Sequence, residues 1–488
     1  MSRVRANAEL VFAAVYLMAC TSSGGVIMGM GAFAEKAICA KLLHATEVDV
    51  AANLAFQILT WASCIWSCLH DSLGPRLCAV TGLSLAVAGH VTLALAAHYH
   101  LNDPHVYAAG LGLVGGGGNG AFLCSFHFTT LGAFKRTRAL RVSLLSTAFS
   151  LAAYPLLILN APSVSIEMFF AAYAGYTAFW TMIAAILFPR RAYRPGDIPQ
   201  IACPTFLVHR CSSSPAGADA DADAGSINNI AARDHRAGHV SASSCCKHTF
   251  CSQLARRTLL DLRLASTDLC QARYWGFCLT FSWAALTQQW AGSAASSKLL
   301  FPHASPAYLK WGVPVLSNAS YLVSPCVGLL IGRTGFIYAA VLVILVMQAV
   351  VALLWVGGLA AQWLVLLALA ALAGLAYPIQ FSYLTMEFDA ASYPGLLTVT
   401  MVVQGTLGFL AWPLLSEVRP FGCADPCPGN FILILVPSTV LFAWPLWLLV
   451  LRIKGRRIRA MGAEESPSQT RPAAVHTTHE RLQEGLLP

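Results

Sequence analysis

Charged residues are scarce in this 488-residue chain. Asp, Glu, Lys and Arg make up 11% of it, whereas soluble proteins carry roughly 25%. Hydrophobic residues account for 57% of the chain. These values exclude an ordinary soluble domain and indicate a protein whose main solvent is lipid.

The sequence also lacks the signatures of common enzymes. It has no nucleophile–base pattern, no phosphate-binding loop and no spacing of ligands that suits a metal ion. Its one dense group of Cys and His, from Cys245 to Cys251, matches neither a zinc finger nor a zinc ribbon. We therefore expect no catalytic activity, no metal and no cofactor.

Long apolar runs recur along the chain, and each is long enough to cross a membrane as a helix. They are too long and too poor in alternation for the strands of a membrane barrel. We expect an all-α membrane protein with twelve transmembrane helices, at 9–33, 52–69, 77–97, 106–133, 142–160, 167–188, 274–295, 311–331, 337–357, 362–386, 393–416 and 430–452.

Lys and Arg predict the orientation of these helices, because they concentrate in cytosolic segments. The short loop 134–141 alone contains Lys135, Arg136, Arg138 and Arg141. Most of the other basic residues fall on the same side of the predicted membrane. We therefore expect both termini in the cytosol, and the net charge of +9 reflects this bias rather than a nucleic-acid partner.

A long polar stretch separates the first six predicted helices from the last six. Its centre reads PAGADADADAG, which is a low-complexity sequence typical of disorder. We predict an N-terminal six-helix bundle (1–188), a largely disordered cytosolic linker (189–272), a C-terminal six-helix bundle (273–452) and a cytosolic tail (453–488). Partners of the linker and tail are unknown.

A polar turn appears once in each half. SCLHDSLGPR occupies 67–76, and the weaker copy GLLIGRTGF occupies 328–336. Asp71 corresponds to Gly332, an offset of 261 residues (332 − 71 = 261). Charged groups in such turns can bind in one conformation and release in another. We predict a gating role for Asp71, Gly74, Arg76, Gly328, Arg333 and Gly335.

These turns resemble the motif G-x-x-x-D-R-x-G-R of the major facilitator superfamily. In the first copy Ser67 replaces the first Gly and Ser72 replaces the Arg that follows the acid. The second copy has Gly332 in place of the acid. The resemblance implies two six-helix pseudo-repeats and a cavity lined mainly by the first, fourth, seventh and tenth helices.

Each of these four helices carries glycines or uncharged polar residues near its centre. The fourth contains Gly115–Gly118, where helix backbones or a ligand can approach closely, followed by Asn119. Packing of helices against each other explains such glycines equally well. The candidate substrate-binding residues are Ser22, Ser23, Gly24, Gly25, Asn119, Gln288, Gln289, Tyr377 and Gln380.

The predicted membrane cores contain no Asp, Glu, Lys or Arg. This argues against tight ion coupling and favours facilitated movement of a neutral or zwitterionic solute. His90 and His127 are the candidates for a proton relay, although a membrane His is more often a structural residue. Cys39, Cys423 and Cys427 fall in extracytosolic loops, where two of them could form a disulfide.

Two stretches, LGAFKRTRAL at 131–140 and FPRRAYRPGD at 188–197, resemble the sodium-independent large neutral amino acid facilitators of solute carrier family 43 and related protozoan transporters. The resemblance implies an alternating-access facilitator or exchanger of neutral amino acids, and we expect it in the plasma membrane rather than an organelle membrane. The alternatives are a transporter of a sugar or monocarboxylate, with or without proton coupling, and a nutrient sensor that binds without transport.

Overall fold

The computed structural model describes residues 2–131, 134, 137–190, 265–296, 305, 307–356, 358–388, 392–411, 414 and 428–464, and its regular elements in these ranges are all helical. Eight helices there are long and apolar enough to cross a membrane, namely Ala6–Cys39, Val50–Ser67, Gly74–His98, Leu140–Asn160, Ile166–Leu187, Phe336–Val356, Ala360–Glu387 and Ile432–Ile453. The chain is thus an integral, multi-pass membrane protein by the length and composition of its helices.

The count of twelve spans stays a prediction. The predicted spans 106–133, 274–295, 311–331 and 393–416 are largely helical where the structure describes them, but they are not among those eight. The predicted linker and tail lie largely outside the described residues, as do Cys423 and Cys427. The boundaries between domains therefore also stay predictions.

The first predicted span is interrupted rather than continuous. Helix α1 (Ser2–Ser22) ends where Ser23 adopts an extended backbone, and a 3-10 helix η1 (Gly24–Gly29) leads into α2 (Met30–Cys39). Glycine has low helix propensity, which favours a break at Gly24 and Gly25. Neighbouring backbone fills the space beside the break, since a Cβ on Gly25 would overlap the Phe149 carbonyl.

The second and third predicted spans form one element, α3 (Ala45–His98), with a sharp kink. Gly74 at the kink has φ +79° and ψ 163°, a region that favours glycine, and Pro75 follows it. The chain therefore reverses within one or two residues and leaves almost no loop between the two spans. This reversal coincides with the predicted turn at 67–76.

The remaining helices of the N-terminal part are α4 (Pro104–Ser125), η2 (Phe126–Thr130), α5 (Arg138–Leu151), η4 (Tyr154–Asn160) and α6 (Ile166–Leu187). Side-chain caps define two of their starts. Asp103 accepts a hydrogen bond from the His105 backbone N–H (2.9 Å), and Ser165 accepts one from Met168 (3.1 Å).

In the C-terminal part, the predicted span 311–331 is divided into η6 (Tyr308–Gly312), α10 (Val313–Leu316), η7 (Ala319–Leu322) and α11 (Ser324–Thr334). Pro314 and Pro325 stand in the first turns of α10 and α11, where a missing N–H is tolerated. The other elements are α8 (Ser266–Leu269), α9 (Ala272–Ser296), α12 (Phe336–Val356), α13 (Leu359–Glu387), α14 (Tyr393–Gly408), α16 (Pro428–Val440) and α17 (Ala443–Glu464).

The second predicted turn has the same backbone geometry as the first. Gly335, between α11 and α12, has φ +82° and ψ 176°, close to the values at Gly74. The two glycines are also separated by the offset that the sequence predicted (335 − 74 = 261). The turn thus recurs as a backbone reversal in both parts of the chain.

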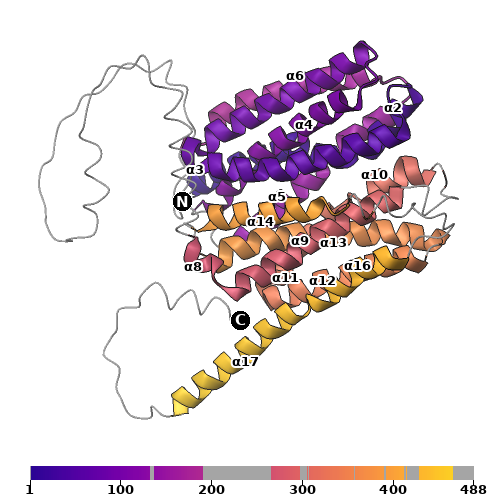
Figure 1. Cartoon of the computed structure of the whole chain (residues 1–488). Helices are drawn as coiled ribbons and strands as arrows, with labels where there is room; N and C mark the ends of the chain where they lie inside the picture. Colours follow the sequence, from indigo (N-terminus) through magenta and orange to yellow (C-terminus); the bar gives the residue numbers. More distant parts are fainter. Residues whose placement is uncertain are drawn as a thin grey trace, which may run out of the picture.

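Figure 1 shows the helices of the early chain above those of the late chain, with α5 of the early group and α14 of the late group in the middle, where the two groups meet. The N-terminus and α8 lie at one end of the molecule, and α2 and α10 lie at the other end (Figure 1). We call these the N-terminal end and the α2–α10 end. Helix α17 extends away from the bundle toward the N-terminal end (Figure 1).

Candidate functional site

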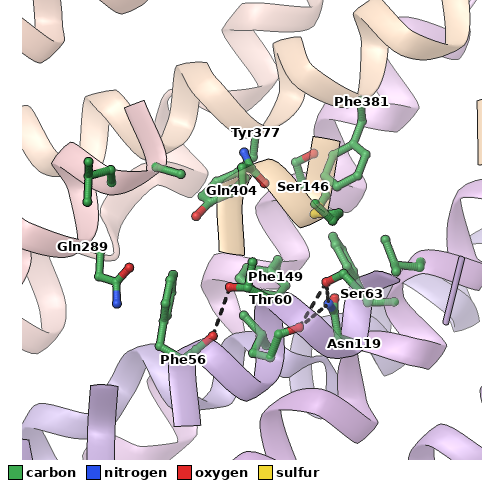
Figure 2. Close-up of a pocket in the computed structure, with 16 residues that line it drawn as sticks. Phe56, Thr60, Ser63, Asn119, Ser146, Phe149, Gln289, Tyr377, Phe381 and Gln404 are labelled. Carbon is green, nitrogen blue, oxygen red and sulfur yellow. Dashed lines mark hydrogen bonds between the residues drawn. The ribbon is translucent and has the colours of Figure 1, made fainter. Parts of the chain in front are cut away.

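A cavity lies between the early and the late helices (Figure 2). No side chain that lines it carries a charge. Its walls come from α3, α4 and α5 on one side and from α9, α13 and α14 on the other. The lining residues are Phe56, Leu59, Thr60, Ser63, Asn119, Phe122, Leu123, Ser146, Phe149, Ala285, Leu286, Gln289, Tyr377, Phe381, Met401 and Gln404.

Asn119 is the best-anchored polar group on the early-chain wall. Its amide nitrogen donates to the Ser63 hydroxyl and to the Leu59 carbonyl oxygen (3.4 Å), so it ties α4 to α3. The side chain is 5% exposed, and Figure 2 shows it pointing toward Ser63 at the cavity wall. An amide fixed in this way presents a pre-oriented polar group to a solute.

A second amide lies on the opposite wall. The amide nitrogen of Gln404 donates to Gln380 Oε1 (3.1 Å) and to the Phe281 carbonyl oxygen (3.4 Å). Gln404 lines the cavity, whereas Gln380 lies behind it and is 1% exposed. The pair satisfies most of its own hydrogen-bonding capacity and holds Gln404 against the cavity.

Aromatic rings form much of the remaining wall. The rings of Phe122 and Phe149 have centroids 5.0 Å apart, and Phe149 lies 6.2 Å from Tyr377 across the two groups of helices. Phe122 also contacts Phe381 edge-on at 6.3 Å. Such rings offer a large apolar contact surface of defined shape.

Three of the nine predicted binding residues line the cavity, namely Asn119, Gln289 and Tyr377. Gln380 supports a lining residue through its hydrogen bond to Gln404. The other five are not in the lining. Gln288 lies next to Gln289 with its Oε1 atom buried and without a hydrogen-bond partner.

The glycines of α4 serve close helix packing. A Cβ on Gly118 would lie 2.7 Å from the Ser22 carbonyl oxygen, and one on Gly117 would lie 2.5 Å from the Gly82 carbonyl oxygen. The break at Ser22, Ser23, Gly24 and Gly25 is thus buried against α4 and α5. It is not in the lining itself but packs behind the lining residues Leu59, Asn119 and Phe149. The closest neighbours of Gly117 and Gly118 are therefore backbone atoms of other segments.

Neither candidate histidine lines the cavity. His90 is 1% exposed and lies edge-on to Tyr173, with ring centroids 4.9 Å apart. His127 stacks on His70 at 4.0 Å and an interplanar angle of 4°. Both therefore lie within the packed helices of the early chain.

The predicted gating residues lie at or near the kink of α3 and within or directly after α11. Arg76 donates from Nε to the Phe188 carbonyl oxygen (2.7 Å). Arg333 is exposed at the end of α11, and Gly328 is buried within it. The side chain of Asp71 lies outside the described residues.

Sequence reasoning overlooked the contributions of α3, α5 and α14 to the cavity. Thr60 and Ser63 are one turn apart within an apolar run, and Gln404 is the one amide in the predicted span 393–416. Residues three apart share a helix face, so this spacing was the available signal for the α3 wall. The predicted lining helices came from the family resemblance, which named only the first, fourth, seventh and tenth helices and so omitted α3, α5 and α14.

The early and late helices meet at both ends of the cavity. At the α2–α10 end, Asn318 donates to the Met28 carbonyl oxygen (3.1 Å), Tyr154 to that of Val315 (2.9 Å), and the hydroxyls of Ser320 and Ser150 bond to each other. Toward the N-terminal end, Phe126 stacks on Phe381 at 4.5 Å. The cavity is therefore bounded by contacts on either side.

No family model and none of the curated proteins matches the sequence. Solved structures do match the fold. A major facilitator superfamily proton:xylose symporter, XylE, is 12% identical, with a TM-score of 0.60 over 92% of this chain and 96% of that one. The Escherichia coli fucose:proton symporter FucP is 13% identical, with a TM-score of 0.52 over 89% and 98%. The chain therefore has the major facilitator fold.

Proposed function

We propose that this protein is an alternating-access transporter of a small solute without net charge, and that a neutral amino acid with an apolar side chain is its leading substrate. The observation that carries the proposal is the cavity between the two groups of helices, which is lined from both and contains no charged side chain. A solute bound there would contact both groups at once, so its binding can favour one arrangement of them over another.

The chemistry of the lining limits the class of solute. An ion with net charge would lose its hydration without gaining an opposite charge, which costs several kcal/mol or more. Amides and hydroxyls instead both donate and accept hydrogen bonds, as Asn119, Gln289, Gln404 and Thr60 can. These groups match a solute that carries a donor and an acceptor with no net charge.

An amino acid with an apolar side chain fits both parts of the lining. Its ammonium and carboxylate groups compensate each other and can bond to the amides of Asn119 and Gln289. Its side chain can contact Phe56, Phe122 and Phe149. The resemblance of 131–140 and 188–197 to neutral amino acid facilitators supports the same substrate.

A sugar is the second candidate. The two solved structures that share the fold are symporters of xylose and fucose. Amides and hydroxyls beside aromatic rings also suit a ring that carries hydroxyl groups. Proton coupling belongs with this candidate, and His90 and His127 would then be tested as proton carriers.

Uptake into proteoliposomes tests the proposal. Radiolabelled leucine should enter, and unlabelled phenylalanine and methionine should compete, with or without a pH gradient. Xylose, fucose and lactate serve as competitors from the other classes. Competition by a sugar alone would replace the leading candidate, and binding without flux would favour a sensor.

Orientation and gating also belong to this proposal. We propose that the N-terminal end is cytosolic and that the protein acts in the plasma membrane. Replacing Asp71 with Ala should impair uptake more than Gly332→Ala, because only the first turn carries an acid. Equal uptake by wild type and the Asp71 variant would remove this acid from the mechanism.

A further inference from the structure

Two glutamines join the early and the late helices beside the cavity. The amide nitrogen of Gln57 on α3 donates to Gln289 Oε1 on α9, at 3.4 Å. Gln57 is 8% exposed, and its own Oε1 atom is buried without a hydrogen-bond partner. The bond is therefore part-buried and crosses the boundary between the two groups of helices.

A glycine on a third helix makes room for this pair. A Cβ on Gly408, at the end of α14, would lie 2.8 Å from Gln57 Nε2 and 3.1 Å from Gln289 Oε1. One turn earlier, a Cβ on Gly405 would lie 3.0 Å from Trp61 Nε1. Two glycines three residues apart thus let α14 approach α3 closely at this level.

The two glutamines stand in different relations to the cavity. Gln289 lines it, at one edge of the view in Figure 2, whereas Gln57 does not line it. Gln289 follows Ala285 and Leu286 along α9 as its last lining residue, so the pair lies at the rim toward the α2–α10 end. A solute that bonds to Gln289 Oε1 must share or replace the bond from Gln57.

We infer that Gln57 is a positioning residue that couples occupancy of the cavity to closure of the α2–α10 end. Its bond to Gln289 holds the two groups of helices together at the rim, and a solute at Gln289 competes for the same acceptor. The inference rests on the proposed transport function, but the bond itself can be tested without any solute.

The solute-free test is hydrogen–deuterium exchange of the purified protein in lipid nanodiscs. Gln57→Leu should increase backbone exchange in the segments around Gln289 and Gly408, because one neutral hydrogen bond shifts an opening equilibrium about two- to tenfold. The control is Gln348→Leu, which removes an amide bond to Thr439 (3.1 Å) within the late helices. Equal exchange in the Gln57 variant and this control would overturn the inference.

A second variant reaches the same bond from α14. Gly408→Ala pushes a Cβ between the two amides without removing either, so it should increase exchange in the same two segments. Its control is Gly292→Ala on α9, where a Cβ would meet no atom within 4 Å. If Gln57→Leu increases exchange but Gly408→Ala leaves it at the wild-type level, the effect of Gln57→Leu comes from lost packing rather than from the lost hydrogen bond, which contradicts the inference.

Uptake of radiolabelled leucine tests the coupling. Gln57→Leu should lower both KM and the maximal rate about two- to tenfold, because more of the protein is open at this end and closure is slower. The double variant Gln57→Leu/Gln289→Leu should be no worse than Gln289→Leu alone. Additive losses in the double variant would overturn the coupling. If leucine uptake is absent while Gln57→Leu still alters exchange, leucine is rejected as the substrate but the role of the Gln57–Gln289 bond stands.

Discussion

Asn119 combines two properties that the sequence could show only separately. It is a polar residue in an apolar helix, and such residues need partners in a membrane. Its partners, Ser63 and the Leu59 carbonyl oxygen, belong to α3, which is about sixty positions earlier in the chain. The sequence therefore predicted the residue but could not predict which wall it would support.

Replacement of Asn119 with Leu should raise KM for leucine about fivefold. The change removes a positioned amide from the cavity, and each lost hydrogen bond is worth about 1 kcal/mol. Uptake by proteoliposomes measures this effect, with Gln348→Leu as a control outside the cavity. An unchanged KM would mean that the solute does not contact this wall.

Gly118→Ala should destabilise the protein by about 1–3 kcal/mol. The new Cβ would lie within 2.8 Å of backbone atoms at Ser22, Ser23 and Gly24, and a packed interior cannot absorb that overlap cheaply. Thermal unfolding in detergent, followed by tryptophan fluorescence, measures the loss. Gly175→Ala on α6, where a Cβ meets no atom within 4 Å, should leave Tm unchanged or raise it.

At the scale of elements, breaks in helices position the chain as much as the helices do. The break after Ser22 lets η1 lie against α4, and the divided segment from Tyr308 to Thr334 brings Asn318 to η1. Glycine pairs and prolines signalled these breaks in the sequence. An apolar run predicts only that a segment can span the membrane, so it could not show where the segment would be interrupted.

The second reversal offers a sharp comparison between neighbouring glycines. A Cβ at Gly332 or at Gly335 would meet no atom within 4 Å, but only Gly335 has positive φ. Gly335→Ala should therefore cost about 1–2 kcal/mol, whereas Gly332→Ala should be neutral or slightly stabilising. Tm is measured for both variants in the same detergent, and equal Tm values for Gly335→Ala and Gly332→Ala would contradict this prediction.

At the scale of the whole molecule, the cavity lies between distant parts of the chain. Its two walls come from segments at least 136 residues apart, the separation of Phe149 on α5 from Ala285 on α9 (285 − 149 = 136). Duplication, visible as the 261-residue offset, predicted two related halves. The offset could not show which faces of the halves meet, because that depends on the packing of side chains across the boundary.

Cross-linking the α2–α10 end should stop transport. The hydroxyls of Ser150 and Ser320 bond directly across the two groups of helices, so cysteines at both positions would lie close enough to pair. Oxidation of Ser150→Cys/Ser320→Cys should abolish leucine uptake, and a reductant should restore it. Each single variant, oxidised in the same way, controls for reactions of the native cysteines. Full uptake after confirmed cross-linking would show that transport does not require this end to open.

The matching torsions at Gly74 and Gly335 separate the path of the chain from the charge of the two turns. A reversal that depends on a positive φ survives any substitution around it, provided that the glycine stays. The charge at the corresponding positions Asp71 and Gly332 can therefore differ between the two turns without loss of the helical hairpin. The path of the chain and the electrostatics of each turn thus depend on different residues.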